Sequence, residues 1–278
     1  MHKWGYAPTL RALAEDLLGG PVEVPTLVHS IRDYAEVVIE DGFVFERGNR
    51  ELLAKSQRRV ESHRTLNGAA RTIAERFAYD LRRACPLVDC IALSGSVASG
   101  GYELRDDIDL NLFVVDGAKY IVYAIALILG FRATLRYRNI RGLRKLICIN
   151  VLWSRGQSHP FARRDQSLAF ELLHSRPLLG EGYFQEVIAA NPWIDAFFPQ
   201  LRRVSGNAPS IPASNRLGKI VEWVGRHPRW LRAVDESARV VTRAVYSGAH
   251  WLRRHDAAAV ERLRFLQRVK YPYEVFQD

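Results

Sequence analysis

The chain has 278 residues, a hydrophobic fraction of 48% and a net charge of +10, which indicates a globular protein of one large or two to three small domains. Its three cysteines lack metal-ligand spacing, which argues against a zinc site or a disulfide scaffold and favours reduced thiols. The first residues show no signal-peptide pattern, so we expect a cytoplasmic protein.

Residues 1–48 predict a winged-helix-like unit. An amphipathic helix over residues 9–18 is followed by a Gly-Gly-Pro break, a second helix begins near Pro25, and Asp41-Gly42 lies between two alternating runs, a strong hairpin signal. Such units often bind DNA. The acidic residues around this hairpin would repel phosphates, so we favour packing or partner binding, with DNA binding as the alternative.

A glycine-serine turn follows the first strand of the next unit. Residues 49–83 predict a long polar connecting helix, with an interruption near Asn67-Gly68 as an alternative, and residues 88–93 predict a buried strand. Gly95 and Ser96 end that strand. Glycine lets the backbone approach a ligand closely and serine offers a hydroxyl beside free amides, so this turn predicts a phosphate-binding site.

A pair of carboxylates follows the turn. Asp107 and Asp109 are two residues apart, so on a strand both point to one face while Ile108 and Leu110 point into a core. Neighbouring carboxylates repel each other unless a cation lies between them, and hard oxygen ligands suit Mg²⁺. Either motif alone is usually a turn or a cap; together and in this order they predict a site for Mg²⁺ and a nucleoside triphosphate (NTP).

The pattern resembles the nucleotidyltransferase superfamily that includes DNA polymerase β, and in particular a bacterial and archaeal group of stand-alone nucleotidyltransferase-domain proteins. The matching segments are Leu93–Ala98, Asp106–Leu110, Leu146–Leu152, Glu171–Leu173, Arg176–Gly180 and Asn191–Trp193. The resemblance implies a transferase that uses Mg²⁺ to move a nucleoside monophosphate from an NTP, with ATP the expected donor, to an acceptor that it does not identify.

The sequence departs from the superfamily at a third carboxylate. Members usually carry it on the strand after the Asp pair, where it completes the metal site; the expected strand, residues 145–153, has Asn150 there instead. Asparagine can coordinate a metal but cannot serve as a base. Either another acid, Glu171 first and Glu103 second, completes the site, or the reaction needs little base help, or the domain binds nucleotide or nucleic acid as a regulatory module without transfer.

Two lysines are candidates for triphosphate contact. Lys119 precedes the longest apolar run, residues 121–131, and Lys145 precedes the third strand; each is as readily a surface lysine. The apolar run has about half the length that spans a bilayer, so we expect a buried helix there and no membrane insertion.

Most of the net positive charge of the chain lies in its last third. Residues 201–278 hold 15 Lys and Arg against 7 Asp and Glu, and three tryptophans, Trp223, Trp230 and Trp251, lie among arginines in predicted helices. Such a surface would bind RNA or a polyphosphate. The alternative is that the tryptophans pack this bundle and the arginines are solvated. The acceptor is therefore open between RNA and a small molecule.

The expected fold class is α+β. We predict a winged-helix-like unit over residues 1–48, a connecting helix over 49–83, a small mixed-sheet nucleotidyltransferase domain over 84–160 and a basic helical domain over 161–278.

Overall fold

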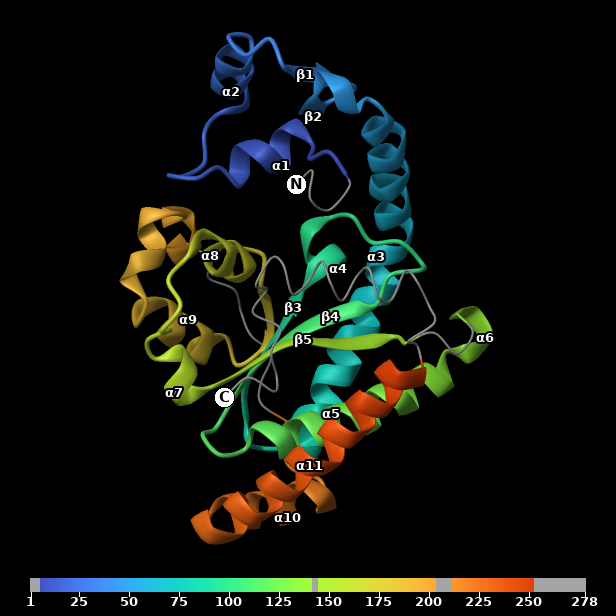
Figure 1. Ribbon diagram of the computed structural model, residues 1–278, viewed down its shortest axis with the longest axis vertical. Coiled ribbons are helices and arrows are strands. Elements are labelled where there is room, and N and C mark those ends of the chain that lie inside the picture. Colours follow the sequence, from blue (N-terminus) through green and yellow to red (C-terminus); the bar gives the residue numbers. More distant parts are fainter. Residues whose placement is uncertain (1–5, 142–144, 204–211, 253–278) are drawn as a thin grey trace.

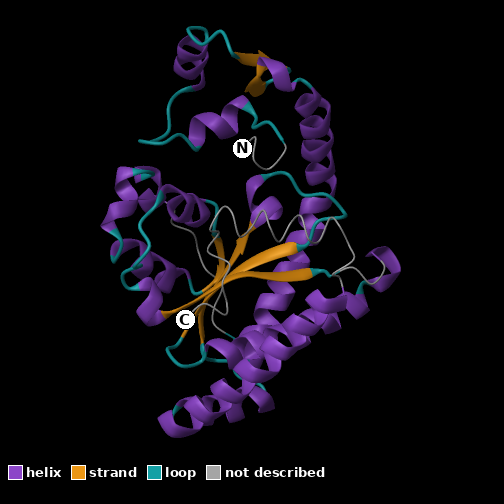
Figure 2. Ribbon diagram, in the orientation of Figure 1, coloured by secondary structure: helices purple, strands orange, loops and turns teal. Residues whose placement is uncertain are grey.

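The computed structural model describes residues 6–141, 145–203 and 212–252. The fold is α+β, with a four-stranded mixed sheet between helices and a separate two-stranded sheet near the N-terminus (Figure 2). In the described part of the chain, no helix is long and apolar enough to cross a membrane.

The N-terminal unit contains the predicted hairpin. Helices α1 (Leu10–Glu15) and α2 (Val24–Ile31) precede strands β1 (Val37–Glu40) and β2 (Phe43–Glu46), which pair antiparallel. Asp41 and Gly42 both have positive φ, at 51° and 77°, as a two-residue type I′ turn requires. A short 3₁₀ turn, η2 (Arg47–Asn49), leads onward.

Helix α3 (Glu51–Ala84) runs without interruption from this unit to the sheet (Figure 1). The alternative of a break near Asn67-Gly68 is therefore wrong. A glycine inside a helix costs about 1 kcal/mol relative to alanine, and the buried Ala70, Ala74 and Leu81 that follow it offset this cost by packing in the main core.

The four-stranded sheet has the order β5-β4-β3-β6. Its strands are β3 (Val88–Ser94), β4 (Ile108–Val114), β5 (Ile147–Ser154) and β6 (Arg176–Leu179). Strands β4 and β5 are parallel, whereas β3 pairs antiparallel with both β4 and β6. Because β6 comes from the range predicted as the helical C-terminal domain, the sheet unit extends beyond residue 160.

Helices cover both faces of the sheet. One face is covered by α3 and α5, on which α10 and α11 pack in turn, and the other face by α8, α9 and two 3₁₀ turns. The bounds of the remaining elements are α4 (Gly95–Ser99), α5 (Lys119–Arg136), α6 (Arg138–Arg141), α7 (Arg155–Ser158), α8 (Gln166–Leu173), α9 (Glu181–Ala189), η3 (Pro192–Ala196), η4 (Pro199–Arg203), α10 (Arg216–Gly225) and α11 (Pro228–Leu252).

Helix α5, expected to be buried, is covered on one side only. Its residues Ile121, Val122 and Ala126 are buried, while Ile128 and Phe131 are more than 60% exposed. The helix packs against β5, α3 and α11, and among the described residues nothing covers the side that carries Ile128 and Phe131.

Candidate metal and nucleotide site

The two predicted carboxylates lie at the start of β4, at one end of the sheet. Asp109 is paired with Ser94 of β3 on one side and with Cys148 of β5 on the other. Ligand atoms of Asp107, Asp109 and Cys148 all lie within 4.8 Å of one another, and the three side chains are half-buried. Two carboxylate oxygens and one sulfur therefore converge where the sequence predicted two carboxylates.

The glycine-serine turn packs directly on Asp109. Gly95 has a φ of +61°, and a Cβ atom at this position would lie 2.1 Å from Oδ2 of Asp109. Only glycine provides both the left-handed backbone and the space. Ser96 follows in the first turn of α4 and is half-buried. The structure therefore brings together the two motifs that the sequence linked only by order.

Electrostatic repulsion is concentrated at Asp109. Burial first, and then the nearby carboxylates of Asp107 and Glu171, together raise the pKa of Asp109 to about 8, while Lys145 and the hydrogen bond with Cys148 act in the opposite direction. A cation between Asp107 and Asp109 would relieve this repulsion. The donor set suits a divalent cation through its oxygens, and the sulfur of Cys148 favours softer metals over Mg²⁺.

Lys145 lies at this site. Its Nζ donates a hydrogen bond to Sγ of Cys148 over 3.0 Å, and the Lys145 side chain reaches solvent. Burial raises the pKa of the Cys148 thiol to about 12, so the thiol is protonated at neutral pH when no metal is bound. Lys145 is therefore the predicted lysine whose charge the structure places beside the Asp pair.

Lys119 lies elsewhere. It begins α5, which follows the opposite end of β4 from the Asp pair, and it is buried beside the ring of Tyr120 at 5.9 Å. The carboxylate of Asp235 accepts hydrogen bonds from the backbone of Tyr120 and Ile121 at this helix end. Lys119 is thus part of the contact between α5 and α11 and not of the candidate site.

A buried polar network lies behind the Asp pair on the same face of the sheet. Asn111 and Asn150 each donate through Nδ2 to Oε1 of Glu171, over 2.7 and 3.0 Å, and Asn150 Nδ2 also lies 3.1 Å from Oδ1 of Asn111. Ser94 and Ser175 complete the network, and all five side chains are buried. Asn150 and Glu171, predicted separately, are therefore hydrogen-bonded partners.

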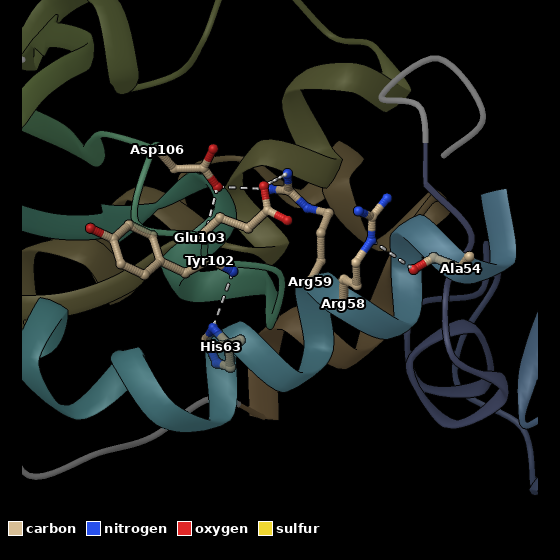
Figure 3. Close-up of polar contacts among 7 residues, drawn as sticks. All are labelled: Ala54, Arg58, Arg59, His63, Tyr102, Glu103 and Asp106. Carbon is tan, nitrogen blue, oxygen red and sulfur yellow. Dashed lines mark hydrogen bonds and ion pairs between the residues drawn. The ribbon is translucent and has the colours of Figure 1, made fainter. Parts of the chain in front are cut away.

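Glu103 belongs to a different cluster, on the loop between the turn and the Asp pair. Figure 3 shows Arg59 of α3 reaching this loop, where it contacts Glu103 at 3.3 Å and Asp106 at 2.8 Å. One helical turn further, Nδ1 of His63 accepts a hydrogen bond from the backbone of Tyr102 over 3.3 Å. Helix α3 thus holds the loop that leads into Asp107, and Glu103 is paired with an arginine.

Sequence reasoning missed Cys148, Asn111 and Arg59. The alternation that placed Asp107 and Asp109 on one face also places Asn111 there, and the same alternation groups Cys148 with Asn150 on the next strand. Spacing along the chain does not mark Cys148, because the three cysteines lack metal-ligand spacing. No local signal marks Arg59, because its partners are 44 and 47 residues away.

Comparison with known proteins adds no assignment: no family model, no curated protein and no solved structure matches the chain.

Proposed function

We propose that this chain is a metal-dependent nucleotidyltransferase that moves a nucleoside monophosphate from an NTP, ATP foremost, to an acceptor, with release of pyrophosphate. One observation carries the proposal: Asp107 directly precedes β4 and Asp109 is the second residue of that strand, packed against the positive-φ turn at Gly95. The resemblance of the same residues to the DNA polymerase β-like superfamily supports it.

Each of these residues has a separate task in the proposal. Asp107 and Asp109 would hold Mg²⁺, which when bound neutralises charge on the triphosphate. The backbone at Gly95 and the hydroxyl of Ser96 would contact phosphate oxygens, and the ammonium of Lys145, exposed beside the pair, would add a positive charge. Because phosphoryl transfer depends mainly on positioning and neutralisation, few further groups are required.

Among the residues that the structure describes, the site has no evident general base to deprotonate the acceptor hydroxyl. Asn150 cannot accept a proton, and its amide is engaged with Asn111 and Glu171. Glu171 is near enough to raise the pKa of Asp109, so its negative charge would add to that of the Asp pair and favour a bound cation. We assign Glu171 the role of supporting that site, ahead of Glu103, which is paired with Arg59.

The experiment is titration calorimetry of each NTP against the protein with Mg²⁺, with Mn²⁺ and with chelator. Wild type should bind in the presence of metal, and Asp107→Asn with Asp109→Asn should abolish that binding, because bare triphosphate and carboxylates repel. Asp116→Asn is the matched control, since it removes an acid beyond the other end of β4, where Asp116 only accepts a hydrogen bond from Gly156. Unchanged affinity in the double variant would refute the site.

A second candidate function is nucleotide or nucleic-acid binding without transfer, as a regulatory module. The network around Asn150 favours it, because the amide takes the place of a carboxylate in a fully hydrogen-bonded setting. Incubation with each α-labelled NTP and total RNA, protein or small-molecule extract separates the two functions. An enzyme leaves label covalently on an acceptor, whereas a binding protein releases all label on denaturation.

A further inference from the structure

Helices α10 and α11 carry an apolar surface that no described part of the chain covers. Its residues are Ile220, Trp223, Trp230, Val240, Val241, Val245 and Trp251, and each is between 52% and 61% exposed. The rings of Trp223 and Trp230 lie 6.5 Å apart, which joins the two helices into one surface. We call these seven residues the α10–α11 apolar surface.

Helix α11 is divided lengthwise into three faces. Leu231, Asp235 and Thr242 are buried and recur at spacings of four and seven residues, which is one side of a helix. Trp230, Val241 and Val245 form an adjacent exposed apolar stripe by the same helical period. A helix that only packed on α5 would need the first face and not the second.

The third face of α11 is basic. Arg232, Arg239 and Arg243 are spaced by seven and four residues, and Arg239 pairs with Glu236 at 2.6 Å. Arg229 and Arg232 are exposed and have no ion-pair partner within the described residues. By the same helical period the arginine face borders Val240 of the α10–α11 apolar surface, and the stripe of Trp230, Val241 and Val245 continues on the far side of Val240. Arg232 and Arg243 are open to solvent, and Arg239 is half-buried.

A shallow hollow lies where these two faces meet. It has a volume of about 280 Å³ and is lined by Arg239, Val240, Arg243, Ala244 and Ser247. Two guanidinium groups at the border of an apolar stripe provide donors for an anionic oxygen next to a surface that excludes water.

We propose that the α10–α11 apolar surface binds peripherally to an anionic membrane, with the valines in the acyl boundary, the tryptophans at headgroup level and the arginines on lipid phosphates. This combination of a large apolar stripe and an arginine-rich polar face is the chemistry of helices that lie in a membrane interface. The three tryptophans at its ends and centre suit the headgroup region, where aromatic rings are enriched.

The exposed valines argue against RNA, the closest alternative occupant of this surface. RNA would use the arginines and stack bases on the tryptophans, but Val240, Val241 and Val245 offer nothing to a polyanion. A two-fold pairing would bring the same surface of a second copy, with its own arginines, onto this one, whereas lipid phosphates offer the opposite charge.

The test uses the full chain and vesicles of phosphatidylcholine, alone or mixed with phosphatidylglycerol. We expect sedimentation with the mixed vesicles and not with pure phosphatidylcholine, weakening as salt rises. Brominated acyl chains should quench the tryptophans. Val240→Ser with Val241→Ser and Val245→Ser should weaken vesicle binding by at least about tenfold, because three apolar side chains would no longer be buried in the membrane.

The matched control is Leu18→Ser with Tyr34→Ser, which removes two exposed apolar side chains of the N-terminal unit and should leave vesicle binding unchanged. Thermal unfolding of wild type and of both sets of variants checks that all of the proteins compared are folded. The proposal is overturned if wild type sediments with no vesicle, if the three serines leave binding intact, or if light scattering shows a wild-type dimer that they dissociate. It is equally overturned if wild type retains RNA and the three serines abolish that retention.

Discussion

The backbone of Gly95 and the carboxylate of Asp109 occupy adjoining space, so that a single added carbon on Gly95 would come within 2.1 Å of Oδ2. The turn therefore fixes the second carboxylate by contact, and the geometry of the proposed metal site depends on a residue with no side chain. The register of β3 and β4, in which Ser94 is opposite Asp109, sets this contact.

Gly95→Ala should abolish or strongly weaken metal-dependent NTP binding. The methyl group forces Asp109 or the turn to move, and the positive φ adds strain of about 1–2 kcal/mol. Gly100→Ala is the control, because Gly100 has a φ of +88° but no atom within 4 Å of an added Cβ. Gly100→Ala should lose only the stability that the positive φ costs in urea unfolding, Gly95→Ala should lose more because of the added contact, and only Gly95→Ala should lose NTP in calorimetry. Equal losses of NTP affinity would contradict this account of the turn.

The metal-free protein should lose stability as pH rises toward 8. Asp109 has a raised pKa of about 8 in the folded state, so across the range between its ordinary value and 8 the folded protein retains a proton that the unfolded chain has released. The stabilising contribution is complete below this range and is lost as pH rises through it. Urea unfolding in chelator, repeated across this range, measures the slope.

Asp109→Asn should flatten this slope, because it removes the titrating group, whereas Asp116→Asn should leave it unchanged. Saturating divalent metal should also reduce it in wild type, since the metal binds the deprotonated form. Identical slopes for wild type and Asp109→Asn would show that Asp109 titrates normally.

Much of the local structure was accessible from the sequence. The Asp41-Gly42 hairpin and the strands that carry Gly95 and Asp109 are encoded within a few residues, by turn chemistry and by alternation. The placement of Ser94 beside Asp109 follows from pairing those two strands.

The parts of the site that come from distant segments were not accessible. The pairing of β4 with β5 shifts between Leu110 and Asn111, so counting along the strand cannot tell which side chain of β5 lies beside Asp109; it is Cys148, with Asn150 beside Asn111. Glu171 reaches the network because α8 packs on the sheet, a long-range contact with no local signature. The tryptophans of α10 and α11 were expected to pack the bundle or to bind a polyanion, and their exposure was not predictable from spacing alone.

Arg59→Gln should destabilise the loop that precedes Asp107. Arg59 is largely buried and pairs with Glu103 and Asp106, which are partly exposed, so we expect a loss of about 1–3 kcal/mol together with weaker NTP binding. Arg58→Gln is the control: Arg58 is exposed and donates a hydrogen bond to the carbonyl of Ala54 in its own helix, as Figure 3 shows, so its loss should stay within about 0.5 kcal/mol. Unfolding midpoints and NTP affinity for both variants give the comparison. A normal NTP affinity in Arg59→Gln would show that the loop does not position Asp107.

The buried pair of Asn150 and Glu171 distinguishes an enzyme from a binding protein. If the chain transfers nucleotide, Glu171→Gln should slow transfer by about a hundredfold, the usual scale for a lost acid-base group, with NTP affinity little changed, because glutamine keeps an oxygen for the two amides. Glu103→Gln should act only through Arg59. Full-rate transfer in both variants would show that neither acid compensates for Asn150.

Asn150→Asp supplies the converse experiment. It replaces an amide donor, 3.0 Å from Oε1 of Glu171, by a second carboxylate, so the metal-free variant should be less stable than wild type, and more so as pH rises, because buried like charges repel. Added divalent metal should recover more stability in this variant than in wild type if the new carboxylate reaches the site. Asn150→Asp with Glu171→Gln removes the repulsion and serves as the folded control. Label transfer by Asn150→Asp in the absence of transfer by wild type would assign the natural chain to the binding class, since one restored carboxylate would then separate it from an active transferase.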